Sequence, residues 1–166
     1  MNIDELIDYI KNQDGNIDRE QEGIPIVNRN HIVPEDLRRF YSLCGGLTLG
    51  SDSDFPAEVL PPQQVVRANP ILFGELYGTG PIDSISENWY LIARYENDDY
   101  ITIDFSDVRL GWCYNSFFGY HANPGYCKIL AHSFTELLSL LAQNPGGVEL
   151  PDADYLPDYG DAYSPK

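Results

Sequence analysis

The chain begins with hydrophobic side chains at helical spacing. Ile3, Leu6 and Ile10 recur every three or four positions, with polar residues between them, which is the pattern of a helix that buries one face. Asn2 followed by Glu5 supplies a capping box, in which the two residues satisfy each other's backbone amides at the helix start. We therefore expect an amphipathic helix at the N-terminal end.

Two later segments repeat the helical pattern. Pro34 is suited to a first helical turn and paired glycines follow Cys44, so we expect a helix over about residues 34–44. Cys44 falls on the apolar face of that helix, which favours a core position over a reactive one. Near the other end of the chain, Ser133 and Glu136 form a second capping box, and an Asn-Pro-Gly stop follows the apolar helical run.

Between these segments the hydrophobic period shortens to two, which is the period of strands. Residues 88–116 fit three strands separated by polar turns. In the middle strand, Ile101 and Ile103 point to one side, whereas Thr102 and Asp104 point to the other. Shorter apolar runs before this meander, separated by Gly, Pro and Asp, predict further strands. Together the patterns predict an α+β domain with an antiparallel or mixed central sheet and helices packed against it.

Length and composition bound the number of domains. The 166 residues are 43% hydrophobic, which is enough for a single domain with a substantial core. We assign this domain to residues 1–148. The remaining residues, 149–166, combine four aspartates with three tyrosines. Such an acidic segment is either weakly ordered or docked by its tyrosines, onto the domain or onto a partner.

Net charge narrows the classes of function. With 26 acidic and 10 basic residues, the chain carries a formal charge of -16. Binding to nucleic acid or to an anionic membrane surface requires a basic patch, so both partners are disfavoured. A basic protein partner is favoured, although acidity that only maintains solubility is the alternative explanation. The three cysteines are too few for a disulfide framework and the acidic N-terminus does not resemble a signal peptide, so we expect a cytoplasmic protein.

Five carboxylates lie within residues 94–107. Three of them, Glu96, Asp98 and Asp99, fall at the turn between two predicted strands, where polar residues stay solvated. A calcium loop would need alternating oxygen ligands around a central glycine, which this stretch lacks. We expect this turn to present charge to solvent rather than to hold a metal ion.

The chain contains no motif for catalysis or for a cofactor. A phosphate-binding loop, a dinucleotide fingerprint, a nucleophile elbow and a paired-histidine zinc motif are all absent from the sequence. Cys113, His121, Cys127 and His132 do not have the spacing of a zinc site, and strand cysteines are commonly buried and unreactive. We therefore expect no enzyme activity, no cofactor and no metal.

Three stretches, in this order, resemble domains of the SUKH superfamily. The stretch "VPEDLRRFYSLCGG" is similar to the proline, helix and glycine pair near the front of these domains, with Cys44 where an asparagine is common. "WYLIARYENDDYITIDFSD" is similar to their strand, polar turn and strand ending in aspartate, and "YCKILAHSFTELLSLL" to their closing strand and helix. The superfamily includes bacterial immunity proteins that neutralise polymorphic toxins, many of them nucleases, and fungal regulators of cell-wall synthesis. The resemblance implies a SUKH-like fold that binds proteins without catalysing a reaction.

Two functional hypotheses follow from charge and resemblance together. In the first, the protein is an immunity-type inhibitor whose acidic surface binds a basic toxin domain, with nucleases as one candidate class. The side chains expected at that surface are Glu96, Asp98 and Asp99 at the turn, with Asp83, Glu87 and Tyr95 as their neighbours in sequence. In the second, the protein is a non-catalytic regulator or scaffold that binds a protein of the same cell.

Overall fold

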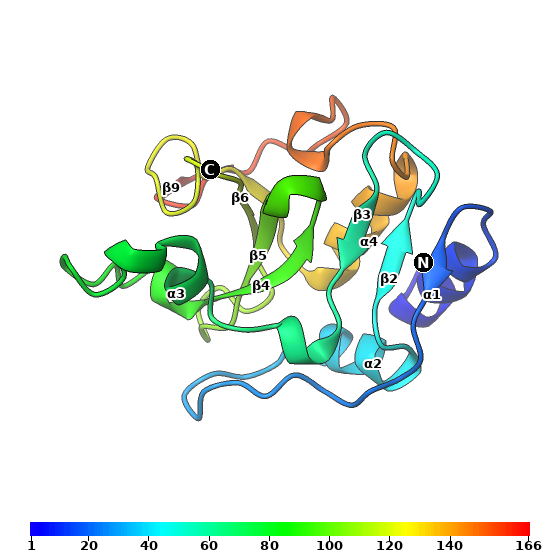
Figure 1. Ribbon diagram of the computed structural model, residues 1–166, viewed down its shortest axis with the longest axis horizontal. Coiled ribbons are helices and arrows are strands. Elements are labelled where there is room, and N and C mark those ends of the chain that lie inside the picture. Colours follow the sequence, from blue (N-terminus) through cyan, green and yellow to red (C-terminus); the bar gives the residue numbers. More distant parts are fainter.

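The structure, a computed structural model that describes residues 1–166, is built around a seven-stranded antiparallel sheet (Figure 1). Each strand pairs with its neighbour along the chain, so the order of strands in the sheet is their order in the sequence. These strands are β1 (Ile17–Asp18), β2 (Leu47–Leu49), β3 (Ala57–Val59), β4 (Trp89–Arg94), β5 (Tyr100–Asp104), β6 (Cys113–Ser116) and β7 (Ile129–Ala131). The predicted three-strand meander is confirmed as β4, β5 and β6.

The helices predicted at the two ends of the chain are present. The α-helices are α1 (Ile3–Lys11), α2 (Glu35–Leu43), α4 (Phe134–Gln143) and a short α3 (Ala68–Leu72) that the hydrophobic pattern did not predict. Single 3₁₀ turns are η1 (Pro62–Gln64), η2 (Gly74–Leu76), η3 (Ser86–Asn88), η4 (Glu96–Asp98) and η5 (Leu150–Asp152). None of the helices has the length and apolar character needed to cross a membrane. The α+β class predicted from the sequence is confirmed.

The two capping boxes predicted from the sequence differ in how completely they form. At α1 the Asn2 side chain accepts the Glu5 amide at 3.0 Å and the Glu5 carboxylate accepts the Asn2 amide at 2.9 Å, which confirms the capping box. At α4 the Ser133 hydroxyl accepts the Glu136 amide at 3.1 Å. The Glu136 carboxylate, however, accepts the amide of His132 at 2.7 Å instead of the Ser133 amide. Only half of the second predicted capping box therefore forms.

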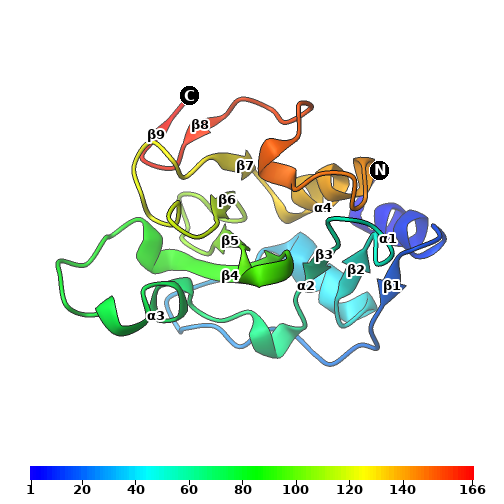
Figure 2. The same cartoon turned by 45° about the horizontal axis from the view of Figure 1, so that its top comes forward.

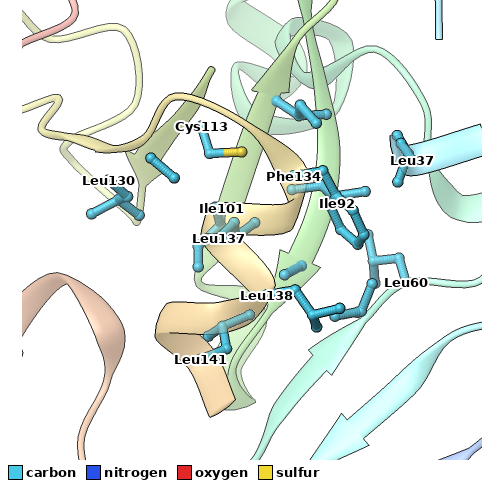
Figure 3. Packing of buried hydrophobic residues seen from close by; sticks show 14 of the residues in the cluster. Leu37, Leu60, Ile92, Ile101, Cys113, Leu130, Phe134, Leu137, Leu138 and Leu141 are labelled. Atoms are coloured by element: carbon cyan, nitrogen blue, oxygen red, sulfur yellow. The ribbon is translucent and has the colours of Figure 1, made fainter. Parts of the chain in front are cut away.

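Helix α4 lies over the middle of the sheet and supplies much of the core. Figure 3 shows Phe134, Leu137 and Leu138 of this helix packed toward Ile92 of β4 and Ile101 of β5, all fully buried. Helices α1 and α2 pack against each other and against α4. The hydrophobic stripe of α4 thus meets the apolar face of the sheet, and the buried residues of α1 and α2 join the same core beside it.

The opposite face of the central strand is also buried. Thr102 and Asp104 of β5, which the alternation placed on the polar side, are 0% and 1% exposed. Asp104 accepts hydrogen bonds from Trp89 Nε1 at 3.1 Å, from the Tyr114 hydroxyl at 2.9 Å and from the Ser106 amide at 2.9 Å. Burial raises the pKa of Asp104, and these hydrogen bonds oppose the rise. The acid at the end of β5 is therefore part of the packed interior.

The acidic C-terminal segment is docked on the domain. Its three tyrosine hydroxyls donate to groups that precede the segment: Tyr155 to the Leu140 carbonyl, Tyr159 to the Glu136 carboxylate and Tyr163 to the Asp83 carboxylate. The segment ends in a small hairpin, β8 (Gly160–Asp161) and β9 (Ser164–Pro165), which lies beside the start of β7 (Figure 2). Ala162, between the two strands, is 0% exposed, and its amide donates to the Cys127 carbonyl at 2.8 Å. Of the alternatives that composition left open, docking onto the domain is the one observed.

Candidate protein-binding surface

The carboxylates Glu96, Asp98 and Asp99 lie at the tip of the β4–β5 hairpin, as the strand pattern predicted. Asn97 and Asp98 adopt left-handed backbone conformations, with φ of 63° and 57°, which short polar residues tolerate better than others. Glu96 and Asp98 are exposed, whereas Asp99 is half-buried. The turn therefore presents two of the three expected side chains fully to solvent.

Ion pairs neutralise part of this charge. Asp98 lies 3.5 Å from Arg94, which also pairs with Glu58 at 2.8 Å, and Glu58 in turn pairs with Arg19 at 2.6 Å. Two guanidinium groups thus balance two carboxylates in a chain along one side of the turn. Glu96 takes part in no salt bridge. The uncompensated charge of the turn consequently comes from Glu96 and from Asp99, its half-buried neighbour.

Asp83 and Glu87 line a different hollow from the one beside the turn, and both already have partners. Burial alone would raise the pKa of Asp83, but hydrogen bonds from Tyr163, from Ser86 and from two backbone amides outweigh it, so the pKa is lowered. Glu87 forms an ion pair with Arg67. The structure does not bring these two acids into the turn, although they are close to it in sequence.

Tyr95 cannot serve as a surface aromatic. Its side chain is 5% exposed, its hydroxyl accepts the Leu150 amide at 2.8 Å, and its ring packs edge-on against Phe117 with the centroids 5.8 Å apart. Burial raises the pKa of its hydroxyl. Residues of the C-terminal segment cover this position, so the expectation that Tyr95 contacts a partner is corrected.

The structure adds acidic residues that sequence reasoning missed. Glu149 lies next to Asp99 and Asp152, and its pKa is raised first by burial and then by the negative charges of these two neighbours. The segment that contains Glu149 is fixed at the hairpin by the hydrogen bond from Leu150 to Tyr95. We refer to Glu96, Asp99, Glu149 and Asp152 as the acidic patch. No local signal could have revealed it, because fifty residues separate its two parts in sequence.

Next to the turn, a cleft of about 590 Å³ opens between the hairpin and two loops. The first loop follows β3 and contains α3, and the second joins β6 to β7. The cleft walls include Phe73, Asp98, Tyr100 and Phe118. Phe118 is 96% exposed, and its amide donates to the Asp99 carboxylate at 3.2 Å. Asp99 therefore connects the acidic turn to an exposed aromatic residue on the neighbouring loop.

A second and larger cleft, of about 820 Å³, shares Phe73 with the first. His121 also lines the first cleft, with its ring centroid 5.3 Å from that of Phe73, and its two ring nitrogens bridge Asn69 Oδ1 at 2.7 Å and Ser116 Oγ at 3.0 Å. Burial lowers the pKa of His121 to about 4, so its ring is neutral at physiological pH. We call the surface formed by the two clefts the two-cleft face. Helix α3 and the segment after it, which line both clefts, lie at the end of the molecule opposite α1, at the left of Figure 1.

Exposed apolar side chains gather on the two-cleft face. They are Ile71 of α3, Leu76, Tyr77 and Ile82 of the segment after α3, and Phe118 of the loop between β6 and β7. Contiguous exposed apolar groups on a folded protein commonly mark an interaction site. The pattern of hydrophobic residues could not reveal this, because the same residue types also fill the core.

The thiols of Cys113 and Cys127 are not activated as nucleophiles. Cys113 and Cys127 are both 0% exposed, and burial raises the pKa of the Cys113 thiol and raises that of Cys127 to about 12. Each thiol donates to a backbone carbonyl. No group of three His, Cys, Asp or Glu side chains is placed to hold a metal ion.

The chain matches one known protein family over most of its length. The sequence pattern of the SMI1/KNR4 family (SUKH-1) matches residues 29–140, which run from before α2 into α4. The chain belongs to the SMI1/KNR4 family. The family resemblance noted in the sequence is thereby confirmed, and the match contains the acidic turn and both loops of the two-cleft face.

One relative resembles nearly the whole chain. The chain is 36% identical over 163 residues to the immunity protein YokJ of Bacillus subtilis (strain 168), an alignment that covers 98% of this chain and 96% of YokJ. No solved structure gives a significant match. Because the alignment with YokJ is nearly complete, it extends beyond the 29–140 family core and includes the C-terminal segment that carries Glu149 and Asp152.

Proposed function

We propose that this SMI1/KNR4-family protein is an immunity protein that binds a cognate toxin in the cytoplasm and neutralises it without catalysing a reaction. The observation that carries the proposal is the similarity to the immunity protein YokJ along nearly the whole of both chains. A shared scaffold alone would be compatible with many functions. Similarity that includes the loops and the C-terminal segment extends to the surfaces that would contact a partner.

The charge distribution indicates what kind of toxin fits. The formal charge of -16 favours a basic partner, and the acidic patch has no lysine or arginine paired with it in a salt bridge. Enzymes that cleave nucleic acids hold phosphates with positively charged groups. A nuclease toxin is therefore the class best matched to this surface, because carboxylates can occupy the same positive site as the substrate's phosphates.

Growth rescue tests the proposal directly. Toxin domains encoded beside the gene for this protein should each be induced in a host cell with and without the protein. We expect one of them to stop growth when expressed alone and to be tolerated when the protein is present. The purified pair should also form a complex on size-exclusion chromatography.

One combination of results would contradict the immunity role. If no neighbouring toxin is tolerated, and the protein recovers only host proteins of unrelated function from its own cell, the immunity role is wrong. The regulator or scaffold hypothesis would then take its place. Survival must also track complex formation, so a variant that folds but does not bind the toxin should lose protection.

A further inference from the structure

Phe118 is the most exposed large hydrophobic residue of the chain, at 96%. Its loop is nevertheless well defined. The Phe118 amide donates to Asp99, the amides of Tyr120 and His121 both donate to the Phe117 carbonyl, at 2.8 Å and 3.2 Å, and Gly119 takes a φ of 81° that favours glycine. An apolar ring held out on an ordered loop loses little further conformational freedom when a partner covers it.

The cleft beside Phe118 combines aromatic walls with one carboxylate. Phe73, Tyr100, Phe117 and Phe118 contribute rings, and Asp98 contributes an oxygen-rich edge that is 72% exposed. Arg94 approaches Asp98 at 3.5 Å but makes its shorter bond to Glu58, at 2.8 Å. An exposed pair of this kind contributes little stability, so Asp98 can accept a second cation.

The ion pair of Asp98 with Arg94 is made from the hollow on the other side of the turn, which both residues line. None of the twelve residues that line the cleft beside Phe118 is a lysine or arginine. The chain contains no lysine or arginine between Arg67 and Arg94, between Arg94 and Arg109, or between Arg109 and Lys128, which are the stretches that form the hairpin and both loops. The other hollows differ in this respect. The hollow on the far side of the turn contains Arg19 and Arg94, and in the larger cleft Asp83 and Glu87 already have partners.

We infer that the cleft lined by Phe73, Asp98, Tyr100 and Phe118 binds an arginine side chain of the toxin, with Phe118 as the apolar anchor beside it. A guanidinium group is planar, stacks on aromatic rings and pairs with carboxylates, so it matches both components of the cleft. The inference rests on the proposed immunity function for the identity of the partner. The chemistry of the cleft itself can be tested without the toxin.

Two short peptides serve as probes for the cleft. Acetyl-Gly-Arg-Gly-amide and its citrulline analogue, which has the same shape but no charge, should each be titrated into the ¹⁵N-labelled protein. We expect saturable amide shifts at Tyr100, Phe118 and Gly119 with the arginine peptide, at least about fivefold weaker binding of the citrulline peptide, and loss of the difference in Asp98→Asn. Equal binding of both peptides, no saturable binding, or shifts centred elsewhere would overturn the inference.

The second arm uses a toxin that the wild-type protein neutralises. We expect Phe118→Ala to weaken toxin binding by at least about tenfold, since aromatic anchors dominate interface energies. Ile26→Ala is the matched control, because Ile26 is also nearly fully exposed, at 94%, but lies outside the face. Equal affinity of Phe118→Ala and wild type would reject the cleft as the contact site while leaving the immunity function intact. Failure to find any neutralised toxin would reject the immunity function, and the peptide result would stand separately.

Discussion

At the scale of single residues, buried polar groups determine how much the interior tolerates change. Asp104 is a charge-bearing side chain at the end of β5, fully buried, and three donors converge on its two oxygens. Removing an acceptor leaves buried donors unpaired, which costs more than the lost hydrogen bonds themselves contribute. Asp104 is therefore a position at which a small substitution has a large effect on folding.

We predict that Asp104→Ala lowers the free energy of unfolding by about 3 kcal/mol, because the indole of Trp89 and the hydroxyl of Tyr114 lose their acceptor. Asp104→Asn retains one carbonyl oxygen and should cost less. Urea denaturation followed by tryptophan fluorescence measures both. An Ala variant as stable as wild type would contradict the role given to this network.

A second prediction at the residue scale concerns His121 and the pH dependence of the free energy of unfolding. The pKa of His121 is about 4 in the folded protein, compared with an ordinary value of 6.5. Between these values the unfolded chain binds the proton and the folded protein does not, so acidification favours unfolding. The stabilisation should be fully present above pH 6.5 and should decrease as the pH falls toward 4, by about 3 kcal/mol in total.

Denaturant titrations of wild type and His121→Gln at a series of pH values measure the contribution of His121 to the free energy of unfolding. The glutamine variant keeps a hydrogen-bonding side chain but has no titrating group. We expect the stability difference between the two proteins to change over this range of pH in the direction given above. Parallel curves would show that His121 titrates normally in the folded state.

At the scale of elements, the C-terminal segment behaves as part of the domain. Tyr159 stacks on His132 with ring centroids 3.9 Å apart, and His132 stacks on Trp112 at 4.4 Å. Arg109 donates to the Ala162 carbonyl at 2.6 Å. These contacts are distributed along the segment, so its docking depends on several weak interactions and on the burial of Ala162.

We predict that Ala162→Glu releases the β8–β9 hairpin, because a carboxylate cannot be buried at that position without a partner. Limited proteolysis should then cut within residues 157–166 at least about tenfold faster than in wild type, since cleavage tracks the population of the open form. Ser164→Glu places the same charge at an exposed position of the hairpin and is the control. Equal protection of both variants would show that the hairpin is not held by this contact.

At the scale of the whole molecule, the location of charge matters as well as its amount. The acidic patch joins the turn to the C-terminal segment, and long-range attraction to a basic partner depends on such a local concentration. Asp99 also accepts a hydrogen bond from the Phe118 amide. A substitution there would change the loop as well as the charge, so Asp99 is not used to test the effect of charge. The carboxylates of Glu96 and Glu149 accept no hydrogen bond and form no ion pair. Their charge can therefore be reversed by substitution with lysine without breaking such an interaction.

We predict that Glu96→Lys with Glu149→Lys slows association with the neutralised toxin by about tenfold at low salt and flattens the dependence of the rate on ionic strength. Stopped-flow or surface-based kinetics over a salt series measures this rate. Asp14→Lys with Asp107→Lys changes the net charge equally at exposed sites outside the patch. If the control pair slows association as much, net charge alone explains the effect and the patch has no special role.

Much of the architecture followed from local sequence. The helical repeat of Ile3, Leu6 and Ile10 and the Asn2 cap gave the position of α1, and the prediction for α2 was correct to one residue at each end. The alternation predicted for β5 is correct as geometry, and the structure adds that the face of Thr102 and Asp104 is covered as well. Periodicity tells which side chains share a face, whereas burial depends on what else packs there.

The candidate site was predicted only in part, and the reason is physical. Spacings of 3.6 and 2 residues are properties of the backbone, so the sequence by itself determined α1, α2, α4 and the β4–β6 meander, their order, the exposed turn and the excess of negative charge. Contacts between distant residues depend on how the chain closes. Only the tertiary structure decided that Tyr95 is covered, that Arg67 neutralises Glu87, and that Glu149 lies beside Asp99.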